Sequence, residues 1–180
     1  MEKKYRLIEN DTTIVDGRTT LYRIEALKDF SDVKKGDKGG YVENEKNLSH
    51  EGDCWVYNSA KVYDNARVYD NAKVYNDAVV RGSAKVFRRA MVRDNAMICG
   101  DAEVSKDADY YVSKNVWSSN RYFTYTRSNK MWTVGCFHGT GEELIRKAYQ
   151  DSEVSGREYK RVVEYVETMF ADLEKDKSKD

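Results

Sequence analysis

A six-residue repeat runs through the middle of this chain. From residue 55 to residue 108 the sequence divides into nine consecutive hexads: WVYNSA, KVYDNA, RVYDNA, KVYNDA, VVRGSA, KVFRRA, MVRDNA, MICGDA and EVSKDA. Alanine closes every hexad, and valine holds the second position of all but one, where Ile98 replaces it. An α-helix needs apolar residues every three or four positions and a simple strand alternates strictly, so neither fits this spacing. The repeat therefore predicts a solenoid.

Each hexad predicts a short strand followed by a corner. The alanine and valine side chains point inward, and the corners hold residue types that tolerate left-handed backbone angles, namely Asn58, Asp64, Asp70, Asn76, Gly82, Asp94 and Gly100. Three such hexads, about 18 residues, complete one triangular coil. We expect a mainly β fold built on a short parallel β-helix of about three coils, filled by β-branched valine.

The hexads resemble the left-handed β-helix of the hexapeptide-repeat superfamily. The resemblance covers residues 55–108 and implies the fold far more than the function, because acyltransferases, carbonic-anhydrase-like enzymes and inert scaffolds share this fold. The wider layout, with Gly39-Gly-Tyr-Val42 and Asn47-Leu-Ser49 ahead of the hexads, also resembles small polymer-forming-like proteins encoded by phages and prophages. This second resemblance implies a viral protein with an anti-defence role in the host cytoplasm.

The segments around the hexads predict three parts. Residues 1–54 form an N-terminal β cap and opening coil, residues 55–116 the β-helix, and residues 117–180 a C-terminal α+β domain with a frayed, charged tail. Strands are expected at 4–8 and 20–27, and residues 110–116 are expected to add part of a fourth coil. A hairpin is expected from 121–127 and 130–136. Capping boxes at Thr140 and Ser155 predict helices to Gln150 and Leu173.

Composition excludes several classes of protein. No apolar run approaches the roughly 20 residues that span a bilayer, and the start lacks a signal-peptide pattern, so we expect no membrane partner. Three cysteines, an odd number, are typical of a reducing compartment such as the cytoplasm. The 31 basic residues balance the 31 acidic ones, which argues against a general polyanion binder.

Residues 18 positions apart should stack, so the outward side chains can be assigned to three faces. The first face carries Trp55, Lys73 and Met91 beside Tyr57, Tyr75 and Arg93, and the second carries Lys61, Val79 and Met97 beside Tyr63, Arg81 and Cys99. The third carries Arg67, Lys85 and Glu103 beside Tyr69, Phe87 and Ser105, and should be solvated. One short terminal segment is not expected to cover the first two faces. Their apolar side chains therefore predict a homotrimer, with an interface at Trp55, Val79, Met91 and Met97.

The sequence argues against an enzyme. A hexapeptide-type acyltransferase requires a histidine general base, and the hexads contain none. A transferase with a displaced base at His50 or His138 stays open as an alternative. Those histidines with Cys54 and Cys136 could make a zinc site, but their spacing matches no familiar pattern, so no metal and no cofactor are expected. Residues 135–141 are interpreted as the start of a helix, not a phosphate loop.

Aromatic and basic residues alternate along the hexads, as in surfaces that stack on bases and pair with phosphates. This pattern predicts ligand or partner binding by Tyr57, Tyr63, Tyr75, Arg81 and Arg93. From residue 55 to residue 114 there are ten basic and eight acidic side chains, too small an excess for a long nucleic acid. The resulting hypothesis is a non-enzymatic, oligomeric protein that binds a host protein or a small nucleotide stoichiometrically. Sequestration of a nucleotide signal between subunits is the alternative within this class.

Overall fold

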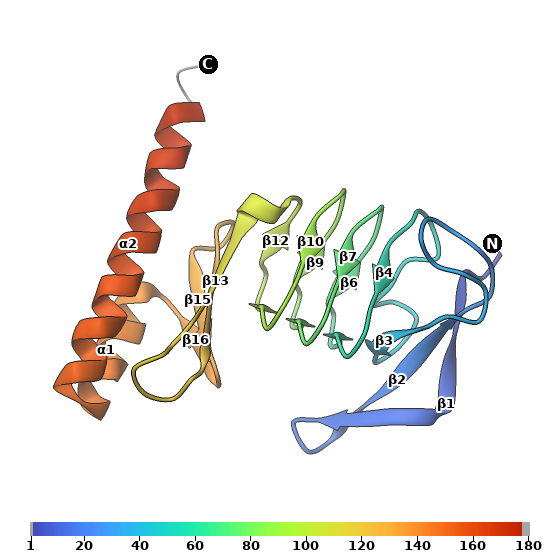
Figure 1. Ribbon diagram of the computed structural model, residues 1–180, viewed down its shortest axis with the longest axis horizontal. Coiled ribbons are helices and arrows are strands. Elements are labelled where there is room, and N and C mark those ends of the chain that lie inside the picture. The colour runs from blue at the N-terminus through green and yellow to red at the C-terminus, as the bar shows by residue number, and fades with distance from the viewer. Residues whose placement is uncertain (1, 178–180) are drawn as a thin grey trace. The chain divides into compact units, whose positions relative to one another are not determined.

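The computed structural model describes residues 2–177 and contains two compact units, one ending at Asp109 and the other starting at Tyr110. The first unit is a parallel β-solenoid with an N-terminal hairpin, and the second combines an antiparallel sheet with two helices (Figure 1). The predicted fold class, a mainly β chain built on a parallel solenoid and ending in two helices, is confirmed.

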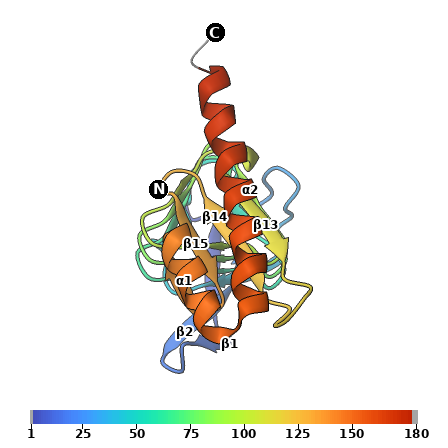
Figure 2. The same cartoon turned by 90° about the vertical axis from the view of Figure 1, so that its left-hand side faces the viewer.

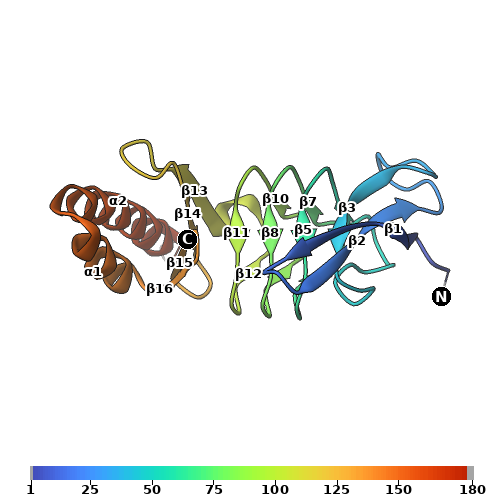
Figure 3. The ribbon, with the colours of Figure 1, turned by 90° about the horizontal axis from the view of Figure 1, so that it is seen from below.

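Short parallel strands build the three faces of the solenoid. One face contains β3 (Lys38–Val42), β5 (Lys61–Val62), β8 (Val79–Val80) and β11 (Met97–Ile98); Figure 3 shows β5, β8 and β11 in a row. The second contains β4 (Trp55–Val56), β7 (Lys73–Val74) and β10 (Met91–Val92). The third contains β6 (Arg67–Val68), β9 (Lys85–Val86) and β12 (Glu103–Val104). The register pairs Val62 with Val80 and Val80 with Ile98, which confirms the 18-residue stacking.

The interior of the solenoid is dry and aliphatic. The alanines that close the hexads from Ala60 to Ala102 are fully buried, as are the inward valines, which leave at most 1 % of their surface exposed. At the corners the chain turns through positive φ angles, for example 54° at Asn58 and 72° at Gly82. The repeat ends at the ninth alanine, because Ala108 is exposed within a short 3₁₀ turn, η1 (Asp107–Asp109).

An opening coil precedes the hexads, so the solenoid has about four turns instead of the three expected. Val42 pairs with Val62 and Leu48 with Val68. These partners lie 20 residues apart, not 18, so two extra residues shift the predicted opening coil out of the hexad register. Cys54 is fully buried at the predicted alanine position. The hairpin of β1 (Tyr5–Val15) and β2 (Thr19–Ala26) continues the sheet beyond β3.

A buried lysine closes the exposed end of the opening coil. Lys4 keeps only 1 % of its surface exposed. Its Nζ donates to the carbonyl oxygens of Cys54 (2.9 Å) and Gly52 (3.1 Å), and it lies 3.3 Å from the Cys54 Sγ. Burial lowers the pKa of Lys4, with the Cys54 thiol opposing the shift. Carbonyls at the end of a solenoid have no preceding strand, and this amine supplies their donor.

The N-terminal segment covers part of the face that carries Trp55, a residue of the predicted trimer interface. Trp55 is 1 % exposed and packs edge-on against Tyr5 and Phe30, at ring-centroid distances of 6.1 and 5.4 Å. The carboxylate of Asp32 accepts hydrogen bonds from Tyr57 and Lys73 on the same face, and the bond from Lys73 lowers the pKa of Asp32 to about 2. Trp55 is therefore part of the intramolecular core and is not available to a second subunit.

On the neighbouring face, Tyr63 is only 5 % exposed. Burial raises the pKa of Tyr63 to about 12, Arg81 opposes the rise, and the carboxylate of Asp16 adds to it. Asp16 follows β1 at the turn of the hairpin, where its φ is 53°. Tyr63 therefore offers little exposed surface to a ligand.

The second unit is a four-stranded antiparallel sheet with both helices on one face (Figure 2). Its elements are β13 (Tyr110–Lys114), β14 (Tyr122–Thr126), β15 (Met131–Val134), β16 (Phe137–Gly139), α1 (Gly141–Asp151) and α2 (Glu153–Lys177). Residues 110–116 do not add to the solenoid as expected, because β13 pairs antiparallel with β14. The predicted hairpin is confirmed as β14 and β15.

Helix α2 packs its apolar stripe on this sheet, as the sequence predicted. Val163, Val166 and Phe170 join Phe123, Tyr125, Trp132, Val134 and Leu144 in one buried core. The capping box at Thr140 is confirmed, whereas α2 begins at Glu153, two residues before the predicted cap, and Ser152 Oγ accepts from the Ser155 N–H. Residues 174–177 are helical instead of frayed, and residues 178–180 lie outside the described part. Within residues 2–177, no helix is both long and apolar enough to cross a membrane.

Candidate ligand-binding groove

The third face of the solenoid carries a ladder of outward side chains. Tyr69 and Phe87 follow β6 and β9, and their rings stack with centroids 5.2 Å apart and planes 7° from parallel. The Ser49 N–H donates to the Val68 carbonyl (2.9 Å), which places Ser49 beside Tyr69 in the preceding coil. On the other side of the pair, Ser105 follows β12 beside Phe87. Two rings are therefore flanked by two small residues.

Two adjoining hollows open at the Tyr69 end of this ladder and share Ser49 and Tyr69. The first, of about 440 Å³, is lined by Lys46, Ser49, Arg67, Val68, Tyr69 and Lys85. The second, of about 550 Å³, is lined by Ser49, Glu51, Gly52, Tyr69, Asp70, Asn71, Arg88 and Arg89. We call the two together the Tyr69 groove. Sequence reasoning treated this face as simply solvated and missed the groove.

The charge of the Tyr69 groove is positive and largely uncompensated. Within residues 2–177, the side chains of Lys46, Arg67 and Arg89 form no ion pair. Lys85 pairs with Glu103 at 2.9 Å, and this partner raises the pKa of Lys85. The first hollow has no carboxylate in its lining, so an anion placed there meets three cations.

Arg88 stands at a corner with a positive φ, and the other positive-φ corners of the hexads hold asparagine, aspartate or glycine. Its φ is 56°, matching the other corners, and its N–H donates to the Asp70 carboxylate (3.0 Å). An ordinary side chain in this conformation costs about 1 kcal/mol or more. Such strained positions concentrate at functional sites. Arg88 is visible in the sequence as an exception at a corner position, and the sequence analysis did not use it.

The structure does not bring the five predicted ligand-binding residues together. Tyr57 and Tyr75 stack on one face, with centroids 4.4 Å apart, and Arg93 lies beside them with an ion pair to Asp107 at 3.6 Å. Tyr63 and Arg81 lie on the neighbouring face, where Tyr63 is buried. The five residues therefore lie on two separate faces, as the 18-residue spacing assigned them, and their role in binding stays a prediction.

The remaining predicted interface residues keep their outward positions. Val79, Met91 and Met97 are half-buried at the first positions of β8, β10 and β11, and Met97 pairs with Val79 along the same face. The homotrimer stays a prediction, now resting on these three residues without Trp55.

The two histidines are structural in their observed contacts. His50 stacks on Tyr5 at 4.3 Å, and its Nδ1 accepts the Lys4 N–H (3.2 Å). Burial lowers the pKa of His50. The Nδ1 of His138 pairs with the Thr133 hydroxyl at 3.0 Å. In the described range, 2–177, no three His, Cys, Asp or Glu side chains are grouped so that they could hold a metal ion.

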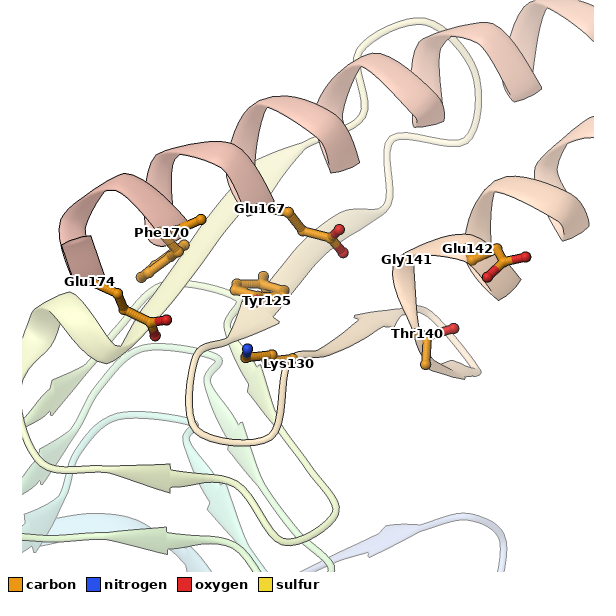
Figure 4. A pocket seen from close by; sticks show the side chains of 9 residues that line it. Tyr125, Lys130, Thr140, Gly141, Glu142, Glu167, Phe170 and Glu174 are labelled. Atoms are coloured by element: carbon orange, nitrogen blue, oxygen red, sulfur yellow. The ribbon is translucent and has the colours of Figure 1, made fainter.

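An acidic pocket of about 420 Å³ lies in the second unit. Figure 4 shows Glu167 and Glu174 extending from α2 on the side of Tyr125 and Lys130. Glu167 accepts the Trp132 indole N–H (2.9 Å), and Glu174 accepts from Arg127 (3.2 Å). Both carboxylates therefore already hold the helix against the sheet. Of residues 135–141, Thr140 and Gly141 start α1, where the Glu143 carboxylate accepts the Thr140 N–H (2.9 Å), whereas residues 137–139 form β16.

Comparison with known proteins gives one partial similarity. No protein-family model matches the chain. A curated protein of Escherichia coli K12, described as the uncharacterized acetyltransferase YdcK, is 39 % identical over 62 residues. The match covers 31 % of this chain and 19 % of that protein, so the chain spans about a fifth of its relative. The solenoid and this similarity together fit the β-helix superfamily.

Proposed function

We propose that this chain is a non-enzymatic binding protein that holds an anionic ligand stoichiometrically in the Tyr69 groove. The observation that carries the proposal is the set of unpaired cations lining the first hollow, above all Arg67 and Lys46. A cation that has no carboxylate partner within the protein can form an ion pair with a bound anion.

The solenoid supports this function by holding the groove rigid. Arg67 and Lys85 stand at equivalent positions of paired strands, and Tyr69 is fixed by its stack on Phe87. A preorganised surface spends little conformational entropy on binding. The net charge of the whole chain is zero, so attraction of an anion must come from local arrangement instead of bulk charge.

Reversing one groove charge is expected to weaken anion binding without unfolding the protein. Arg67 is exposed on the solenoid surface, so Arg67→Glu leaves the core intact. Calorimetric titration with inorganic triphosphate should give a Kd at least about tenfold weaker than the wild-type value. Wild-type binding should itself weaken as salt is raised.

Arg93→Glu is the matched control, since Arg93 has the same chemistry on another face and belongs to the set predicted from the sequence. It should bind triphosphate as the wild type does. Loss of binding in Arg93→Glu, with retention in Arg67→Glu, would move the site to the Tyr57 face and reject the Tyr69 groove.

Acetyl transfer is the second candidate, favoured by the similarity to the E. coli acetyltransferase. Coenzyme A is itself an anionic nucleotide, so its binding alone does not separate the two functions. The two functions are separated by measuring whether the protein releases the free thiol of coenzyme A from acetyl-CoA in the presence of a panel of amine and hydroxyl acceptors. We expect no release above background from the wild type; turnover that His50→Ala or His138→Ala removes would establish an enzyme and overturn the binding-protein proposal.

The viral origin, the anti-defence role and a host protein partner stay predictions of the sequence resemblance. The proposed anion binding does not depend on them.

A further inference from the structure

We infer that the space above the Ser49 side chain, beside the Tyr69 ring, is a slot for an aromatic ring, so the anion held in the Tyr69 groove is a nucleotide. This inference rests on the proposed function and names the chemical class of its ligand. It starts from the geometry of the ladder formed by Ser49, Tyr69, Phe87 and Ser105.

Successive coils of a parallel solenoid repeat at the strand spacing of about 4.8 Å. Phe87 follows this repeat and lies parallel to one face of the Tyr69 ring. At the next ladder position, Ser49 ends at its hydroxyl, which accepts the Glu51 N–H (3.0 Å). Both hollows of the groove are lined by Ser49 and Tyr69. A planar ring placed above Ser49 would therefore continue the aromatic stack by one layer.

The opposite end of the ladder is unsuited to the same ligand. The Ser105 hydroxyl and N–H both donate to the Asp109 carboxylate, each at 2.9 Å. A phosphate attached to a ring at that end would meet this negative charge. The Tyr57–Tyr75 stack is unsuited as well, because Asp32 binds the Tyr57 hydroxyl at 2.8 Å.

The charges on the two sides of the slot orient the ligand. On one side Lys46, Arg67 and Lys85 form a lining without carboxylates, which suits the phosphates. On the other side the Glu51 and Asp70 carboxylates accompany the arginines, so this side can accept N–H groups from the edge of a base. A ring bearing phosphates matches both sides at once, whereas inorganic phosphate matches only the first.

The test compares ATP and GTP with inorganic triphosphate by calorimetric titration of the full chain. A base stacked on Tyr69 should make ATP or GTP bind about tenfold tighter than triphosphate. Ser49→Phe fills the slot with a ring of the protein itself. It should remove this tenfold gain, so that ATP and GTP bind this variant no tighter than triphosphate binds the same variant. Ser105→Phe places the same ring at the other end of the ladder and should leave all three titrations unchanged.

The outcomes separate the two proposals. If none of the three compounds binds, the proposed anion-binding function fails. If triphosphate binds and both nucleotides bind no tighter, the anion groove stands and the ring slot is wrong. If circular dichroism shows that Ser49→Phe does not fold, Tyr69→Leu decides instead: it keeps apolar bulk without a ring, and an undiminished nucleotide gain in that variant rejects the slot.

Discussion

Val80→Asp is expected to leave the chain unable to fold. Val80 is fully buried in β8, where its strand pairs with those of Val62 and Ile98. A carboxylate at this position would have no donor, and burying it costs several kcal/mol even if it takes up a proton. Each coil of a solenoid is stabilised by its neighbours, so a defect in a middle coil breaks the stack on both sides. Total stabilities of about 5–15 kcal/mol do not withstand this loss.

The measurement is far-ultraviolet circular dichroism, in which the β-sheet signal of the first unit is followed as the protein is heated. Val79→Asp is the matched control, because Val79 is the preceding residue of the same strand and points outward. It should fold and melt within a few degrees of the wild type. Cooperative folding of Val80→Asp would show that this wall of the solenoid is not the dry interior described above.

Lys4→Met is expected to lower the free energy of unfolding by about 3 kcal/mol. Methionine keeps the length and apolar stem of lysine but removes the amine that serves the carbonyls of Gly52 and Cys54. Those acceptors then lie buried without a donor, which costs about 1–3 kcal/mol each. The effect should extend to the cap as a whole, because Lys4 also joins the N-terminal strand to the opening coil.

Urea unfolding followed by circular dichroism measures this loss. Lys3→Met provides the comparison, since the neighbouring Lys3 is exposed and pairs with Glu45 at the surface. Surface pairs of this kind contribute about 0–1 kcal/mol, so Lys3→Met should change little. Equal stability of the two variants would mean that the opening coil does not depend on the buried amine.

The solenoid could be predicted because its information is local. The six residues of a hexad determine which side chains point inward and where the chain turns. The 18-residue spacing therefore predicted the wall shared by Val62, Val80 and Ile98. The same holds for the capping box at Thr140 and for the apolar stripe of α2. The opening coil was expected from Leu48 and Cys54, but its 20-residue spacing left its pairing unassigned. Residues 110–116 were misassigned because β13 pairs antiparallel with β14, and no repeat in the sequence marks that partner.

The sequence by itself determined the period, the buried alanines and valines, and the order of side chains along each outward ladder, since all of these depend on distances counted along the chain. Only the tertiary structure decided which faces are covered, because Phe30 and Asp32 reach the Trp55 face from a segment with no repeat. It also decided where the candidate groove lies. Ser49 lies beside Tyr69 because of the irregular coil. Within residues 2–177, Lys46 and Arg67 form no ion pair, whereas Lys85 pairs with Glu103.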